Sequence, residues 1–455
     1  MADNWTLANI KERAASGGKK NIGDVIVADI YANAEEIAAK VLVCRKEKAG
    51  TFDEKIDNIL TSRLFGYPVM LCLLSAVFWL TIEGANHISQ IIAGFLFTVQ
   101  NHLTALCNML GAPAWLHGIL VLGAYRSSAW VVAVMLPPMA IFFPLFTLLE
   151  DLGYLPRVAF NLDSLFKKCH ACGKQALTMC MGFGCNAAGV VSCRIIDSPR
   201  ERLIAMLTNT FVPCNGRFPT FIALAAIFVA GEGAKFGGAL VALTVTAVVL
   251  TGIAFTFCAS WLLSRTVLKG VPSSFVLELP PYRLPQVGAV IYRSIIDRTV
   301  FVLKRAIIMA APAGAVIWVL ANFSIGGVNA SSYLALWLQP VGHAIGLDGF
   351  ILLAFLLGLP ANEIVLPILL MSYLAAGEMT ELQSLAQLGQ ILTANGWTLL
   401  TAVNMMLFCL LHWPCTTTLL SVYKESGSFK WTVVAFLLPA LTAFSVCFFT
   451  TMVFR

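Results

Sequence analysis

The chain has 455 residues, of which 58% are hydrophobic and 12% are charged. Soluble domains carry roughly 25% charged residues, about twice this share, and the mean hydropathy of the chain is +0.81. These values exclude a disordered tail and an ordinary cytosolic enzyme. The net charge of +6 is too small and too scattered for a nucleic-acid footprint. The composition is that of a polytopic protein whose solvent is the lipid bilayer.

The charge pattern divides the chain into membrane segments. A helix needs about 20 apolar residues to cross the hydrocarbon core, and runs of this order with at most one charge recur throughout. The neutral stretch 84–125 carries three histidines and several amides, so we expect it to lie at an interface or to dip into the membrane. The sequence predicts an all-α bundle of about nine membrane segments, at 64–82, 127–149, 175–193, 203–230, 236–264, 306–347, 349–375, 382–423 and 431–453.

Hydrophilic stretches set the expected organisation. Residues 1–63 have no pattern of a cleavable signal peptide, and we interpret them as a cytoplasmic stub or connector. Residues 64–264 form the first membrane half. Lys and Arg gather on the cytoplasmic side of membrane proteins, so the basic stretch 265–305 is predicted to be a cytoplasmic amphipathic connector. Residues 306–455 form the second half, and the N-terminus is cytoplasmic.

Two apolar runs of the first half contain helix breaks. Three glycines and an asparagine within residues 181–189 weaken a continuous helix, and two prolines within 211–219 remove backbone donors. In lipid, the freed backbone groups must be satisfied inside the protein or in a wet cavity. The notable residues of the two breaks are Gly182, Gly184, Cys185, Asn186, Pro213, Cys214 and Arg217.

The second half repeats this arrangement. Its first break, 358–363, contains Asn362 and Glu363, and its second break, 412–418, contains Pro414 and Cys415. A Gly-x-x-x-Asn sequence followed by Pro-Cys therefore occurs once in each half. Interrupted hydrophobic segments at corresponding positions of two halves point to a binding site near the membrane midplane.

The side chains at the breaks suit a transition metal. Thiols, a carboxylate and amides fit a borderline divalent cation better than Mg²⁺ or an organic anion. Alternatively, the cysteines allow close helix packing, the Pro and Gly residues are kinks, and Glu363 pairs with Arg217. The predicted metal ligands are Cys185, Asn186, Cys214, Glu363 and Cys415, with Gly182, Gly184, Pro213, Arg217, Asn362 and Pro414 as gating or structural residues.

Two further features carry weaker expectations. Glu150 and Asp151 end an apolar run and would either gate the path or dock a partner, unless they are simply a solvated helix end. Cys169 and Cys172 have the spacing of a redox or zinc half-site, but a tetrahedral zinc site needs a second ligand pair. Their role stays open.

Several motifs together resemble the membrane module of the FeoB ferrous iron transporters, over about residues 53–453. One departure is Ala361-Asn362, where the family usually has a small residue and a lysine. The matching segments are Asp53 to Asp57, Leu149-Glu150-Asp151-x-Gly153-Tyr154-Leu155, Gly182 to Asn186, Cys214-x-x-Arg217-x-Pro219, Glu363-Ile364-Val365, Pro414-Cys415-x-Thr417-x-Leu419 and Lys424-Glu425-x-Gly427-Ser428.

The resemblance implies import of Fe²⁺ across the bacterial cytoplasmic (inner) membrane. Two Gate regions, the first at about 140–264 and the second within 306–455, would line the path with the predicted cysteines. Fe²⁺ is the transported substrate, no cofactor is bound permanently, and the chain is not an enzyme. It carries no G-x-x-x-x-G-K-[ST] or Asn-Lys-x-Asp motif, so we expect control by a separate FeoB-type G protein and a FeoA-like small protein.

Other interpretations keep the architecture but change the role. Gate-type segments also resemble those of nucleoside carriers, so the cargo would then be a nucleoside or another small solute. A non-transporting membrane scaffold is a third reading. The sequence does not distinguish Fe²⁺ from Mn²⁺ or Zn²⁺, a channel from a carrier, or a monomer from a homo-oligomer.

Overall fold

The computed structural model describes residues 22–41, 52–62, 64–168, 173–231, 237–269, 282, 285–325, 328–374 and 385–454. These residues are almost entirely helical. The two strands among them, β1 (Ser324–Ile325) and β2 (Val328–Asn329), form one short antiparallel pair. The predicted all-α fold is confirmed. The Cys169 and Cys172 pair lies outside the described residues.

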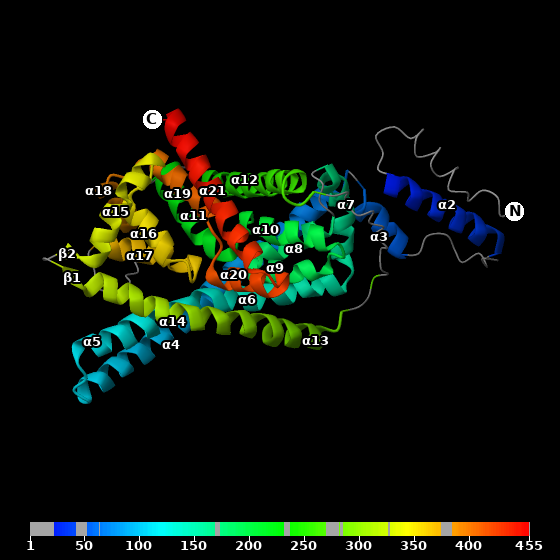
Figure 1. The fold of residues 1–455 in the computed structure, drawn as a ribbon. Coiled ribbons are helices and arrows are strands. Elements are labelled where there is room, and N and C mark those ends of the chain that lie inside the picture. Colours follow the sequence, from blue (N-terminus) through cyan, green and yellow to red (C-terminus); the bar gives the residue numbers. More distant parts are fainter. Residues whose placement is uncertain are drawn as a thin grey trace.

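The N-terminal helices lead into a long helical hairpin. α2 (Ile22–Val41) and α3 (Phe52–Leu60) lie at one end of the molecule, and the tip of the hairpin projects near the other end (Figure 1). The hairpin consists of α4 (Gly66–Met109), a turn, and then α5 (Ala114–His117), η1 (Gly118–Tyr125) and α6 (Arg126–Asp151).

The first part of the stretch 84–125 belongs to α4, which continues without a break through 44 residues. At 1.5 Å per residue this helix is about 66 Å long. No proline falls between Pro68 and Pro113, and the chain turns only at Gly111, whose φ is 65°. Polar side chains alone do not end a helix, since their backbone hydrogen bonds remain intact.

The first set of broken helices follows α6. It is made of short pieces where a regular bundle would have long helices, and it ends with the straight helix α12. The pieces are α7 (Tyr154–Lys168), α8 (Lys174–Gly184), α9 (Asn186–Ser192), η2 (Cys193–Ile195), α10 (Pro199–Thr208), η3 (Asn209–Phe211), η4 (Asn215–Arg217), α11 (Phe218–Leu224), η5 (Ala225–Ala230) and α12 (Gly237–Arg265).

The second set repeats the pattern of short pieces after one long helical run. Residues 287–305 of the expected connector are helical and lead directly into α14. The elements are α13 (Val287–Tyr292), η6 (Arg293–Val300), α14 (Phe301–Asn322), α15 (Ala330–Ala344), α16 (Gly349–Leu357), η7 (Asn362–Ile364), α17 (Val365–Tyr373), α18 (Leu385–Ala394), α19 (Leu399–Leu411), α20 (Thr416–Ser426) and α21 (Phe429–Phe454).

The described residues contain six helices that are long and apolar enough to cross a membrane, or seven if the pair α15 and α16, bent by 111°, counts as one span. Two further apolar helices, at residues 66–81 and 362–373, are shorter than a full span, so the predicted number of about nine is reached only if they are counted as well. The six long candidates are residues 114–151, 199–230, 237–265, 287–322, 399–426 and 429–454.

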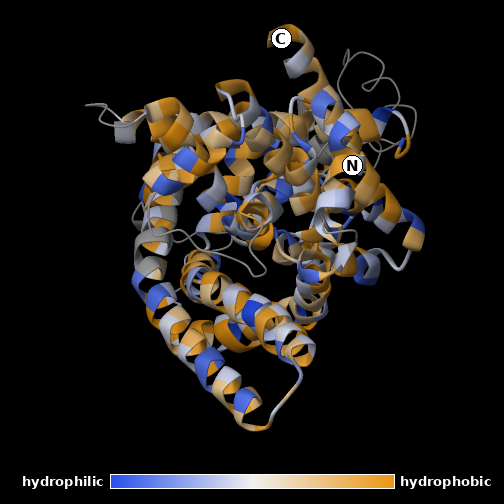
Figure 2. Cartoon of the chain, turned by 90° about the vertical axis from the view of Figure 1, so that its left-hand side faces the viewer, coloured by the Kyte–Doolittle hydropathy of each residue, from blue (hydrophilic) through white to orange (hydrophobic). Residues whose placement is uncertain are grey.

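The packing is that of a membrane protein with a buried centre. Hydrophobic residues are frequent along the outer helices as well (Figure 2), and Trp79, Leu250 and Leu441 are each more than half exposed. In contrast, most residues of α16, α17 and α19 are buried, and the ring centroids of Phe355 and Phe408 lie 4.9 Å apart between two of these helices. The broken helices therefore lie in the protein interior, where their freed backbone groups find partners.

Candidate functional site

The first break of each half has the same backbone shape. Cys185 separates α8 from α9 with φ −156° and ψ 125°, and Ala361 precedes η7 with φ −153° and ψ 125°. Each is a single extended residue followed by an asparagine, Asn186 or Asn362, that begins the next helix. The repeat predicted from Gly-x-x-x-Asn is thus present in the backbone.

The second break of each half is also shared. Cys214 (φ −78°, ψ 164°) precedes η4, and Cys415 (φ −62°, ψ 157°) precedes α20. A proline, Pro213 or Pro414, stands directly before each cysteine. Proline cannot continue the hydrogen-bond ladder of a helix, so it fixes where the chain leaves the helical path.

The two halves differ in their donor atoms. The position of Cys185 is held by Ala361 in the second half, and the position of Glu363 is held by Ala187 in the first. The first half therefore contributes two thiols, and the second contributes one thiol and one carboxylate. The breaks of the two halves thus share a backbone pattern but carry an asymmetric set of donor atoms.

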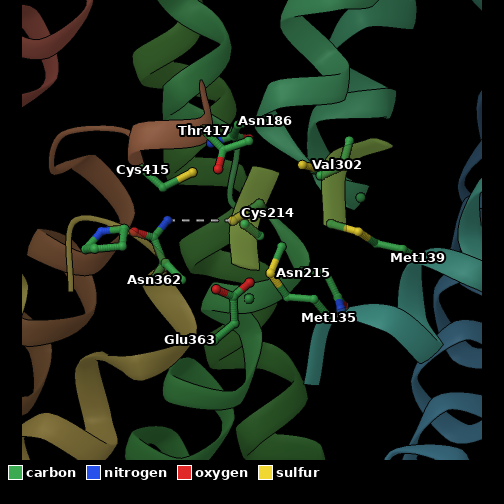
Figure 3. A pocket seen from close by; sticks show the side chains of 16 residues that line it. Met135, Met139, Asn186, Cys214, Asn215, Val302, Asn362, Glu363, Cys415 and Thr417 are labelled. Carbon is green, nitrogen blue, oxygen red and sulfur yellow. Dashed lines mark hydrogen bonds between the residues drawn. The ribbon is translucent and has the colours of Figure 1, made fainter. Parts of the chain in front are cut away.

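The four breaks meet at one cavity of about 30 Å³ (Figure 3). All five predicted metal ligands line it. Its walls come from the breaks and from α6 and α14. The lining residues are Met135, Met139, Gly184, Cys185, Asn186, Cys214, Asn215, Gly216, Val302, Ala306, Pro360, Ala361, Asn362, Glu363, Cys415 and Thr417.

Close packing at the cavity depends on glycine. A Cβ atom on Gly216 would lie 2.0 Å from Glu363 Oε1, so only glycine lets this carboxyl group lie against η4. A Cβ atom on Gly184 would lie 2.4 Å from the Phe142 ring. These glycines are needed for contact across the cavity wall.

Hydrogen bonds tie the breaks together. Asn362 Nδ2 donates to Cys214 Sγ at 3.9 Å (dashed in Figure 3), which joins the two halves. The backbone N–H and the hydroxyl of Thr416 both donate to the Leu359 carbonyl oxygen, at 2.9 and 3.1 Å. The two breaks of the second half therefore satisfy each other's freed groups.

Arg217 is fully buried and connects the halves through carbonyl groups. Its Nη1 donates to Leu410 O at 2.7 Å and to Thr210 O at 3.2 Å. Among the described residues no ion pair within 4.0 Å joins Arg217 to Glu363, so the geometry does not contain the pairing that the sequence left open. The guanidinium binds the carbonyl end of α19, where helices carry partial negative charge.

The donors share a cavity without forming a closed metal site. In the described part of the chain, no three His, Cys, Asp or Glu side chains are close enough to hold a metal ion. A resident metal centre would need such a cluster. The described donors are therefore more widely spaced than the ligands of a resident metal centre.

The remaining predicted residues lie outside the cavity lining. Gly182 packs against Asn209, where a Cβ atom would be 2.6 Å from Oδ1, and Pro213 and Pro414 precede lining cysteines. Glu150 and Asp151 are exposed at the end of α6. The sequence argument missed Met135, Met139, Asn215 and Thr417 as lining residues, because an apolar or neutral residue in an apolar run carries no signal of its own.

The sequence argument also missed an ion pair beside Glu150 and Asp151. Arg157, whose side chain is 2% exposed, donates from Nε and Nη2 to the two carboxylate oxygens of Asp57. Its guanidinium stacks 4.0 Å from the Tyr282 ring centre, and the Tyr282 hydroxyl donates to Asp57 Oδ1 at 2.6 Å. Hydrogen bonds from Arg157 hold the pKa of Asp57 below its usual value, and burial together with the bond to Asp57 raises the pKa of Tyr282 to about 12.

Comparisons with known proteins agree with this geometry. The Gate family model, described as nucleoside recognition, matches residues 132–228 and 303–429, which contain all four breaks. The model of the ferrous iron transport protein B C terminus matches residues 245–297. No solved structure matches the chain.

Curated relatives have the same name in several organisms. Fe(2+) transporter FeoB of Staphylococcus aureus (strain MSSA476) is 27% identical over 91% of this chain and 61% of its own length. The proteins of that name from Campylobacter jejuni and Synechocystis are 27% and 29% identical, over 91% and 93% of this chain and 67% and 66% of their own. The chain thus spans about three fifths to two thirds of these relatives. The chain belongs to the FeoB family and corresponds to its membrane module.

Proposed function

We propose that this chain carries Fe²⁺ across the membrane through the cavity between the four breaks. The observation that supports this best is that three thiols and one carboxylate, Cys185, Cys214, Cys415 and Glu363, come from four separate breaks and line one cavity. Relatives along nearly the whole chain are named as Fe²⁺ transporters. Sulfur and oxygen donors together suit this borderline cation.

The size of the cavity determines how the ion would pass. A water molecule needs about 10–15 Å³ of such space, so a cavity of about 30 Å³ holds two or three waters. An ion with a full hydration shell does not fit. Fe²⁺ would therefore exchange most of its waters for protein donors as it enters, and the thiols that bind it would release their protons.

The small volume of the cavity argues against a nucleoside as the cargo, although the matching Gate family model is described as nucleoside recognition. A small-molecule pocket usually measures about 300–1,000 Å³, which is at least ten times the cavity of this chain. The described residues offer thiols at the breaks where a nucleoside would need flat apolar surfaces. We therefore favour a metal ion as the cargo.

Uptake into proteoliposomes tests the proposal. The reconstituted chain should accumulate Fe²⁺ under anaerobic conditions, and Cys214→Ser and Glu363→Gln should each slow uptake by about tenfold or more, the usual scale for lost metal-site interactions. Cys409→Ser is the matched control, because Cys409 is buried in α19 but does not line the cavity. Fe²⁺ uptake that is unchanged by both cavity substitutions, or absent in the unaltered chain with its partners, would contradict the proposal.

We further infer that a FeoB-type G protein, with a FeoA-like small protein, controls opening from the side of α2 and α3. The ion pair of Asp57 and Arg157 supports this, since it joins α3 to α7, which leads to α8 and the Cys185 break. The expected orientation places these helices on the cytoplasmic side of the bacterial inner membrane. Addition of a purified G domain with GTP should change the rate of Fe²⁺ uptake, and an unchanged rate would count against this control.

A further inference from the structure

We propose that Met135 and Met139 on α6 coordinate the transported ion through their thioether sulfurs and make the site selective for softer divalent cations. This inference rests on the proposed transport of Fe²⁺ through the cavity. Both residues line the cavity. They are four residues apart on one helix, and this spacing puts two side chains on the same face.

On the cavity wall formed by α6 and α14, Met135 and Met139 are the only lining residues whose side chains could coordinate an ion. This wall contributes Met135, Met139, Val302 and Ala306 to the lining, and only the two methionines carry a heteroatom in their side chains. Met139 lies on the side of the cavity opposite Cys415 and Asn362 (Figure 3). An ion held by the breaks would otherwise face hydrocarbon over this side, with nothing to replace the waters it loses.

The local backbone of α6 is suited to an ion path. Pro137 and Pro138 stand between the two methionines, and neither can donate a backbone hydrogen bond. The carbonyl groups of Ala133 and Val134, four residues earlier, therefore lack their usual helical partners. Proline in a membrane helix is tolerated where such groups are satisfied by protein or by a polar cavity.

Met139 also lines a second cavity beside the first. This smaller cavity of about 10 Å³ has Met139, Gly184 and Asn215 in common with the first and extends to Thr81, Phe142 and Phe183. Met139 is buried, with 5% of its surface exposed. A leucine would have a similar volume, but only the thioether offers an ion a ligand atom where the two linings meet.

The consequence is a preference among cations. Thioether sulfur is a soft ligand that binds late transition metals, whereas Mn²⁺, Mg²⁺ and Ca²⁺ favour oxygen. Replacement of both methionines by leucine nearly conserves side-chain volume, and cores tolerate swaps of this kind best. The double variant Met135→Leu/Met139→Leu should keep its fold and lose about tenfold in preference for Fe²⁺ over Mn²⁺, a typical scale for a lost metal-site contact.

X-ray absorption at the iron edge tests the coordination directly. The full chain is labelled with selenomethionine, purified in detergent and loaded anaerobically with Fe²⁺, so that selenium marks a methionine ligand and sulfur marks cysteine. We expect selenium neighbours of iron in the otherwise unaltered chain and their loss in the double variant. Met206→Leu is the control, because Met206 is buried away from the cavity, and it should retain the selenium signal.

The outcomes separate the two proposals. Iron bound with sulfur and oxygen neighbours but no selenium would overturn the role of the methionines and leave the proposed function intact. A selenium signal that persists in the double variant would overturn that role as well. Failure of the unaltered chain to bind any Fe²⁺ would overturn the proposed function, and the methionine proposal with it.

Discussion

Arg157 donates two hydrogen bonds to the carboxylate of Asp57, from Nε to Oδ1 at 2.9 Å and from Nη2 to Oδ2 at 3.1 Å. Arg157 Nη1 also donates to the Gly153 carbonyl oxygen at 2.7 Å, at the turn that follows α6. The pair therefore joins α3 to the junction of α6 and α7. A two-pronged contact of this kind fixes direction as well as distance, so movement of α3 is passed to α7.

Asp57→Asn should weaken this junction. The substitution leaves the Arg157 charge buried without its carboxylate, and hydrogen bonds to charged groups are worth about 2 kcal/mol. We expect a lower melting temperature of the purified chain. Glu36→Gln is the control, because Glu36 pairs with Lys40 on an exposed helix face and should show no measurable change. Equal melting temperatures of Asp57→Asn and Glu36→Gln would show that the ion pair of Asp57 and Arg157 does not stabilise the chain.

The cluster of Asp57, Arg157 and Tyr282 predicts that the stability of the folded chain decreases both at acid pH, the acid limb, and at alkaline pH, the alkaline limb. The pKa of Asp57 is lowered in the folded chain, so its contribution is present above the ordinary carboxyl pKa and is lost as pH falls below it. The pKa of Tyr282 is raised to about 12, so its contribution is present below the ordinary tyrosine pKa, near 10, and is lost as pH rises towards 12.

Melting temperatures measured across this range check both limbs. Asp57→Asn should remove the acid limb contributed by the cluster, and Tyr282→Phe should remove the alkaline limb while leaving the acid limb in place. If the melting temperature of Tyr282→Phe still falls at alkaline pH, a group other than Tyr282 causes that decrease.

Gly216→Ala should impair transport more than folding. The added Cβ atom would lie 2.0 Å from Glu363 Oε1, so the carboxyl group must move away from the cavity wall. The free end of a side chain shifts more readily than the backbone, and we therefore expect Fe²⁺ uptake to fall while the chain remains folded. Gly238→Ala is the control, because its Cβ atom would meet no atom within 4 Å. Normal uptake by Gly216→Ala would mean that the position of Glu363 is not critical.

The sequence pattern was sufficient for the parts of the site that interrupt an apolar run. A cysteine, an asparagine or a glutamate beside Pro or Gly stands out in such a run, and Cys185, Cys214, Glu363 and Cys415 all line the cavity as a group. The physical cost of a broken helix in lipid is what made these positions visible.

Other features could not be predicted, for equally physical reasons. Met135 and Met139 continue the apolar pattern of α6, so their place at the cavity depends on how α6 packs against the breaks. The partner of Arg157 lies 100 residues earlier, and a single sequence contains no information on such a distant pairing. The length of α4 was not predicted either, because the polar side chains after residue 83 end the apolar run in the sequence, although they leave the backbone hydrogen bonds of the helix intact.

The asymmetry between the halves gives the sharpest test of the repeat. Ala361 lines the cavity and has the backbone angles of Cys185, within 3° in φ and with the same ψ. Ala361→Cys would therefore add a fourth thiol where the repeat would place one. If the four breaks close around an ion, four thiolates complete a tetrahedral zinc site, which should bind Zn²⁺ tightly and release it slowly. We expect Zn²⁺ to block Fe²⁺ uptake by this variant at concentrations lower by about tenfold, which corresponds to 1.4 kcal/mol in binding free energy.

The matched control is Ala354→Cys, which adds a thiol to a fully buried position of α16 that does not line the cavity. Co²⁺ loading gives a second readout, because cobalt–thiolate absorption rises with each cysteine that binds. An increase in Ala361→Cys but not in Ala354→Cys would place the new sulfur beside the other three. If Ala361→Cys instead matches the unaltered chain in both zinc block and cobalt absorption, the four breaks do not converge on a single ion, since a thiol at the equivalent position of the repeat could not then reach the metal.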